Sequence, residues 1–154
     1  TADKRSAPDP LRRAAGLTAL AFAAVYGTLI LLVYFTQMTA VRLDPLSENA
    51  MAILNYQQFG LFFSYDLLGY GFMALATFFA GLSFRADGKA ERWLKALLLI
   101  HGVFFPACLA MPMLGVFSNG AEGAQWIGTA VLLFWCAYFI PVGCLSAAYF
   151  RKHC

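Results

Sequence analysis

The sequence predicts an all-α integral membrane protein: a four-transmembrane-helix bundle with both termini cytoplasmic and a short extra helix in the first outer loop. Three observations predict this fold. Of the 154 residues, 61% are hydrophobic and only 12% are charged, and the mean hydropathy is +0.67. Soluble domains are usually about 45–50% apolar and about 25% charged. Long runs of the chain also contain few or no charged residues. Most basic residues lie before the first of these runs, between the second and third, or after the fourth.

Four apolar runs are each longer than the roughly 18 residues that mark a candidate transmembrane helix. Three of them contain no Asp, Glu, Lys or Arg: residues 14–41, 96–121 and 123–150. The fourth, residues 49–84, contains one charged residue, Asp66. A hydrocarbon core about 30 Å thick needs about 20 helical residues. Within a single membrane domain over residues 1–154, the expected spans are about 16–39, 60–84, 93–117 and 125–150.

The basic residues predict how the spans are oriented. Ten of the eleven lie in three groups separated by an even number of spans: residues 4–13, 85–95 and 151–152. Only Arg42 falls on the other side. Lys and Arg near span ends are retained in the cytoplasm, so both termini should be cytoplasmic, in the cell (inner) membrane. The net charge of +3 therefore describes membrane orientation, and we expect no nucleic acid as a partner.

Residues 47–58 are expected to form a separate short helix in the first outer loop. A single helix over residues 49–84 would be about 54 Å long, which overshoots the membrane. Ser47 is a good N-cap, and Glu48 suits the positive end of a helix. We expect a break near Gly60. The alternative is that residues 47–58 extend the second span outward.

Asp66 is the only formally charged residue between Asn49 and Phe84, the run that contains the second span. It lies about 9 Å below the outer end of the second span by helical rise. A carboxylate in hydrocarbon costs about 2–3.5 kcal/mol on insertion scales, and less away from the midplane. It should therefore face protein or a water-filled cavity. The expected ligand pocket is outward-facing and contains Asp66, Tyr34, Gln37, Tyr70, Trp126 and Thr129.

A structural role for Asp66 is the alternative. In that case the carboxylate hydrogen-bonds Gln37, Tyr34 or Arg42 and locks the first two spans together. Buried polar pairs fix the register of helices without any ligand.

His101 is the other titratable residue expected inside a span. We expect it to hydrogen-bond a carbonyl or hydroxyl group on a neighbouring helix, and Thr77 of the second span offers one. The four cysteines show no C-x-x-C pair and no zinc spacing. A metal would need more N, S or O ligands, and a haem would prefer a second axial histidine. The sequence therefore predicts no metal and no cofactor.

Three functions are compatible with these features. The sequence favours binding or transport of a small amphiphilic or cationic ligand around Asp66, with a homo-oligomer expected because four spans are few for a transporter. The second is a non-catalytic structural or regulatory subunit of a larger membrane complex. The third is a lipid- or quinone-directed membrane enzyme with Asp66 and His101 as acid and base. Their difference in depth, about 10 Å or more, argues against catalysis, and no catalytic residue is predicted.

Overall fold

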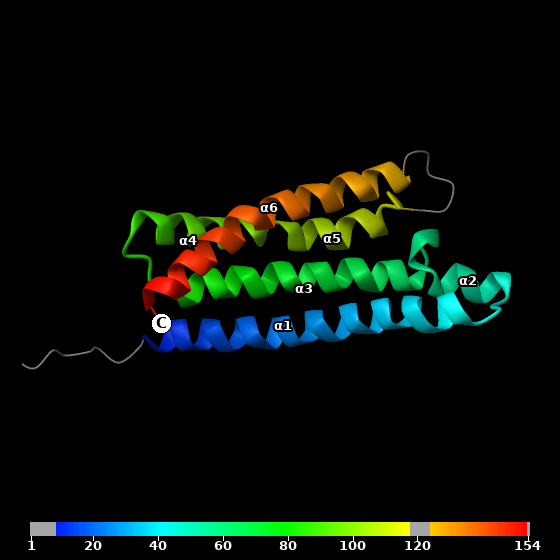
Figure 1. Ribbon diagram of the computed structural model, residues 1–154, viewed down its shortest axis with the longest axis horizontal. Coiled ribbons are helices and arrows are strands. Elements are labelled where there is room, and N and C mark those ends of the chain that lie inside the picture. Colours follow the sequence, from blue (N-terminus) through cyan, green and yellow to red (C-terminus); the bar gives the residue numbers. More distant parts are fainter. Residues whose placement is uncertain (1–8, 118–123, 154) are drawn as a thin grey trace, which may run out of the picture.

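The computed structural model describes residues 9–117 and 124–153, and in this part of the chain every regular element is a helix (Figure 1). Four stretches are long and apolar enough to cross a membrane: Pro10–Val41, Leu61–Ser83, Lys89–Met113 and Trp126–Lys152. The prediction of four membrane-capable helices is thus confirmed. The hairpin expected between the third and fourth spans lies mostly outside the described residues.

The first and third of these stretches begin earlier than expected, because polar groups cap them. Helix α1 (Pro10–Thr36) starts where the Asp9 carboxylate accepts a hydrogen bond from the Leu11 backbone at 3.1 Å, with proline in the first turn. Helix α4 (Lys89–His101) starts where Glu91 accepts from the Gly88 backbone at 3.0 Å. Hydropathy locates the apolar core of a span, whereas capping groups decide where the helix begins.

Helices α1 and α3 (Leu61–Ser83) lie side by side and antiparallel, below the other long helices in the view of Figure 1. Phe22 stacks on Phe72 and Phe79 with ring centroids 5.8 and 5.7 Å away. Gly69 lets the helices approach, since a Cβ there would lie 3.0 Å from the Ile30 side chain. The last turn of α1 continues as a π-helical turn, η1 (Gln37–Val41).

The third membrane-capable stretch is interrupted in the middle, between α4 and α5 (Phe104–Met113). Pro106 has no backbone N–H, so the Gly102 carbonyl accepts a hydrogen bond from Phe105 at 3.2 Å instead. Gly102 also lies against α3, where a Cβ would approach Phe78 to 2.7 Å. The interruption therefore brings the end of α4, and His101 with it, close to α3.

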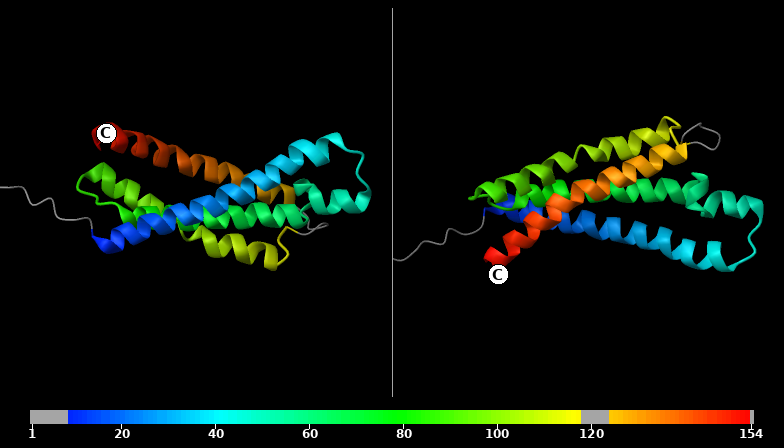
Figure 2. Two further views of the ribbon diagram at one scale, coloured as in Figure 1. Left: turned by 90° about the horizontal axis from the view of Figure 1, so that it is seen from below. Right: turned by 45° about the horizontal axis from the view of Figure 1, so that its top comes forward.

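Helix α6 (Ala124–His153) crosses the other helices obliquely (Figures 1 and 2). Three side-chain hydrogen bonds among the described residues join it to α4, and the one from Trp135 to His101 is described below. The Tyr138 hydroxyl donates to the Leu97 carbonyl at 2.5 Å, and the Lys152 ammonium lies 2.8 Å from the buried Glu91 carboxylate. Lys152 lies near the C-terminal end of α6 and Tyr138 near its middle.

The short helix expected in the first connection is present as α2 (Glu48–Leu54), followed by a 3₁₀ turn, η2 (Tyr56–Gln58). Ser47 caps α2 by accepting from the Ala50 backbone at 3.3 Å. Phe59 then adopts a left-handed conformation with φ of 54°, and the chain turns into α3 at Gly60. The break is therefore where the sequence indicated, and residues 48–54 are not an extension of α3. We call residues 48–59 the roof segment.

One side chain, Gln37, ties the roof segment to α1. Its amide nitrogen donates to the Leu54 carbonyl at 2.8 Å, and its amide oxygen accepts from the Tyr56 backbone at 3.3 Å. Because one amide makes both bonds, α2 and η2 fold back over the end of α1. This places Tyr56, Gln57 and Phe59 above the depth of Asp66.

We predict that Gly60→Ala destabilises the protein. A Cβ at Gly60 would lie 2.1 Å from the Ala52 backbone oxygen, and this contact is relieved only by moving the roof segment. We expect a loss of about 1–3 kcal/mol in the free energy of unfolding, measured as a lower melting temperature in detergent. Gly143→Ala is the control, since nothing lies within 4 Å of a Cβ there. Equal melting temperatures for the two variants would contradict the assigned turn.

Candidate functional site

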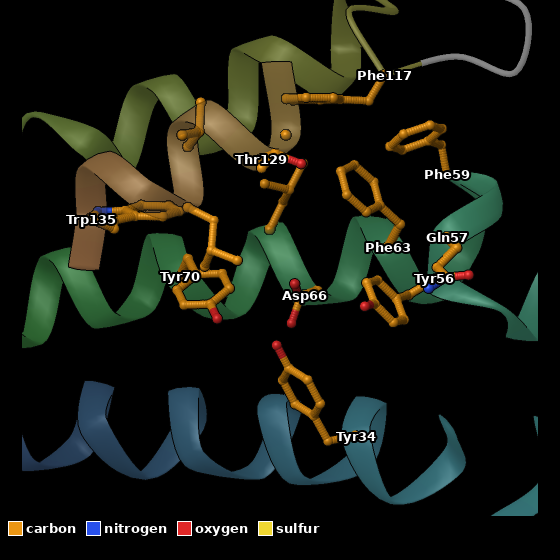
Figure 3. Close-up of a pocket in the computed structure, with 14 residues that line it drawn as sticks. Tyr34, Tyr56, Gln57, Phe59, Phe63, Asp66, Tyr70, Phe117, Thr129 and Trp135 are labelled. Atoms are coloured by element: carbon orange, nitrogen blue, oxygen red, sulfur yellow. The ribbon is translucent and has the colours of Figure 1, made fainter. Parts of the chain in front are cut away.

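A cavity of about 420 Å³ lies between α1, α3, α6 and the roof segment (Figure 3). It is near the end of the bundle that carries α2, away from the C-terminus (Figure 1). The side chains around it are mainly aromatic and aliphatic, and one is charged. The lining residues are Tyr34, Tyr56, Gln57, Phe59, Phe63, Asp66, Leu67, Tyr70, Phe117, Gly128, Thr129, Val131, Leu132 and Trp135.

Asp66 is the charged residue of this lining. It projects from α3 toward α1 (Figure 3) and is only 9% exposed. Its Oδ1 atom is buried without a hydrogen-bond partner among the described residues. A buried acceptor left unpaired costs about 1–3 kcal/mol, and more when it is charged. The bundle thus holds a carboxylate with one buried oxygen that has no hydrogen-bond partner among the described residues.

Three tyrosines surround this carboxyl group. Figure 3 shows the hydroxyl ends of Tyr34, Tyr56 and Tyr70 directed toward the space around Asp66. The rings of Tyr34 and Tyr56 lie 6.4 Å apart, so the last part of α1 and the roof segment meet beside the carboxyl group. On the opposite side, Tyr70 stacks on Trp135 of α6 with centroids 4.8 Å apart. The polar part of the cavity is therefore enclosed by aromatic faces.

The other end of the cavity is formed by three phenylalanines. Phe63 contacts Phe59 edge to face at 4.9 Å and Phe117 at 5.1 Å, and Phe59 lies 6.1 Å from Phe117. The left-handed backbone at Phe59 is unfavourable for a residue with a side chain, by about 1–2 kcal/mol. The ring contacts offset this cost. Backbone strain of this kind gathers at binding sites, where it directs a side chain into place.

Four of the six residues expected around the ligand line the cavity: Asp66, Tyr34, Tyr70 and Thr129. Gln37 lies nearby but is not part of the lining, since its amide is occupied by the roof segment. Trp126 is 75% exposed and lies one turn closer to the start of α6 than Thr129. Depth alone places it beside Asp66, but the rotation of α6 turns it away from the cavity.

Of the expected structural contacts, the described residues make the one between His101 and Thr77 but not those of Asp66. His101 and Thr77 are hydrogen-bonded at 2.7 Å, as their equal depth predicts. Arg42 is exposed, and no ion pair joins it to Asp66 within the described residues. In the same part of the chain, Asp66 makes no hydrogen bond to Gln37 or Tyr34 either. The alternative in which Asp66 locks α1 to α3 through such a bond is therefore not supported.

The structure adds residues that the sequence did not indicate. Tyr56, Gln57 and Phe59 reach the cavity because the roof segment folds back, a contact that no local pattern reveals. Trp135 carried a readable signal. Gly128, Val131, Leu132 and Trp135 recur at steps of three and four and share one face of α6.

The site contains no metal-binding arrangement among the described residues, which hold no group of three or more His, Cys, Asp or Glu side chains. The acid–base pair considered for an enzyme is not assembled either. Both ring nitrogens of His101 are engaged, one with Thr77 and one with Trp135 at 3.0 Å, and His101 does not line the cavity.

Comparisons with protein-family models, with curated proteins and with solved structures give no match for this chain.

We predict that Asp66→Asn raises the melting temperature of the ligand-free protein in detergent. The substitution removes a buried charge whose Oδ1 has no partner in the described residues, and leaves the side-chain shape unchanged. Asp87→Asn, which changes an exposed acid paired with Arg85, should have little effect. A lower melting temperature for Asp66→Asn would contradict this prediction, because it would mean that the folded protein stabilises the Asp66 carboxylate without a ligand.

Proposed function

We propose that this small multi-pass membrane protein binds a small amphiphilic organic cation in the cavity around Asp66. One observation carries the proposal: a buried carboxylate with an unpaired oxygen lies in an aromatic cavity of about 420 Å³. Cavities of about 300–1,000 Å³ are typical of small-molecule sites. Charged side chains within spans are usually functional, because placing them there is unfavourable.

The charge and the rings both favour a cation. A carboxylate attracts a positive charge strongly where water is scarce. The faces of Tyr, Trp and Phe attract a cation through the ring quadrupole, by about 2 kcal/mol or more when the site is desolvated. Tyr34, Tyr70 and Trp135 provide such faces next to Asp66. An anion or a neutral polar ligand would find neither interaction.

The two ends of the cavity define the rest of the ligand. The cluster of Phe59, Phe63 and Phe117 suits an apolar group, and Asp66 suits the cationic head. A protonated amine fits better than a quaternary ammonium group. Only the amine has an N–H that pairs with the Asp66 carboxylate, and a charge-assisted hydrogen bond is stronger than a neutral one.

The distribution of basic residues supports a cavity that faces outward. In the described chain, Arg12, Arg13, Arg151 and Lys152 lie at the end of the bundle opposite to the roof segment. The positive-inside rule assigns that end to the cytoplasm of a cell membrane. We propose binding rather than transport, because the stacked Tyr70 and Trp135 close the cavity on the side of His101.

Matched ligands test the proposal. Benzyltrimethylammonium and neopentylbenzene have the same shape but differ by one charge, since carbon replaces nitrogen. We expect the cation to bind at least tenfold more tightly, in nanodisc calorimetry corrected with empty nanodiscs. Protonated benzyldimethylamine should bind more tightly still. Asp66→Asn should remove the preference for charge, while Asp87→Asn should keep it. Equal binding of the charged and neutral ligands to the unchanged protein would reject the proposal.

The affinity should also depend on pH. Benzyltrimethylammonium keeps its charge at every pH, so any change reports the protein. A proton and the cation compete for the Asp66 carboxylate, so binding should weaken as the pH is lowered. Asp66→Asn should bind weakly and equally at every pH. A pH-independent affinity in the unchanged protein would show that another group anchors the cation.

A further inference from the structure

His101 is the most deeply buried large side chain in the described protein that does not line the cavity. It is 1% exposed, at the end of α4, where the interruption before Pro106 brings it between α3 and α6. Aromatic rings enclose it, with Phe104, Tyr138 and Phe139 at centroid distances of 5.3, 5.6 and 5.0 Å. Such a shell leaves the imidazole room for its two hydrogen bonds and for little else.

The two hydrogen bonds determine which nitrogen carries the proton. The Trp135 indole nitrogen is a donor only, and it lies 3.0 Å from His101 Nε2. Nε2 therefore accepts, and the neutral ring carries its hydrogen on Nδ1. Nδ1 then donates to the Thr77 hydroxyl at 2.7 Å. The Thr77 hydroxyl donates in turn to the Ala74 carbonyl at 2.9 Å, so every polar hydrogen in the chain is used.

This chain of hydrogen bonds ends at the wall of the cavity. Trp135 is 6% exposed, and its ring stacks on Tyr70 with an interplanar angle of 28°. Both residues line the cavity next to Asp66. The indole has a single N–H, and its direction toward His101 fixes how the ring plane is rotated. A change at His101 should therefore alter the surface that faces the ligand.

We propose that His101 is a positioning residue, which holds the Trp135 indole against Tyr70 through its unprotonated Nε2 and so sets the shape and charge preference of the cavity. The effect on ligand affinity rests on the proposed function. The effect on Trp135 does not, because the hydrogen bond and the stack are present without a ligand. The two consequences are therefore measured separately.

Two substitutions distinguish the role of Nε2 from a general packing role. Gln reaches about as far as Nε2 and carries an acceptor oxygen there, whereas Asn reaches only the position of Nδ1. His101→Gln therefore keeps an acceptor for Trp135, and His101→Asn keeps only a partner for Thr77. Both introduce an amide into the same shell of rings. Thr77→Val is a further control, since it removes the other bond and leaves Nε2 in place.

The first measurement follows Trp135 without any ligand. The chain has three tryptophans, and replacing Trp93 and Trp126 by Phe leaves Trp135 as the only indole. In this background we expect His101→Asn to raise the acrylamide quenching constant of Trp135 at least twofold. His101→Gln and Thr77→Val should stay near the starting value. Equal quenching in the Asn and Gln variants would overturn the proposal.

The second measurement uses benzyltrimethylammonium. We expect His101→Asn to lower its affinity about tenfold and His101→Gln to restore most of the loss. In a Trp135→Phe background, which lacks the indole N–H, the Asn and Gln variants should bind equally, and a remaining difference would refute the role of Nε2.

If the unchanged protein does not bind the cation, the proposed function fails while the quenching result still decides the positioning role. If His101→Asn does not fold and His101→Gln quenches like the starting protein, the rescue supports the proposal; if neither folds, packing alone explains His101 and the proposal is rejected.

Discussion

Inside a bilayer, a polar atom must find its partner within the protein, and this constraint governs the polar contacts of the bundle. The hydroxyl groups of Thr28, Thr36 and Thr39 each donate to a carbonyl one turn back along the first membrane-capable stretch. Gln37 uses both ends of its amide, and His101 uses both of its ring nitrogens. Against this background, the unpaired Oδ1 of Asp66 is an exception. Our proposed function assigns a cationic ligand to this carboxylate.

Hydrogen bonds join α6 to α4, and ring contacts join it to α3. The ion pair between Lys152 and Glu91 holds the C-terminal end of α6 against α4, and the Tyr138 hydroxyl bond holds the middle of α6. The first half of α6 carries residues that line the cavity, and there Trp135 stacks on Tyr70 of α3. The same helix therefore makes an ion pair near the C-terminus and lines part of the cavity near the roof segment.

Much of this fold could be predicted from the sequence, because its signals are local. Charge-free runs locate the spans, Ser47 marks the start of α2, and Gly60 marks the turn into α3. Depth along a helix was enough to pair His101 with Thr77, and to bring Tyr34, Tyr70 and Thr129 near Asp66. Depth does not determine rotation, which is why Trp126 was expected at the site and Trp135 was not. The roof residues were missed for another reason: their position depends on the amide of Gln37, a contact between segments distant in sequence.

The π-helical turn η1 has a consequence for how the roof segment is held. A π turn contains more residues per turn than an α turn, and it changes the rotational phase of the residues after it. The turn begins at Gln37, the residue whose amide binds the roof segment. The roof segment is thus held by a residue of a π-helical turn rather than by a residue of a regular α-helix. The number of residues in this one turn therefore determines the direction of the Gln37 side chain, and with it the position of the roof segment over the cavity.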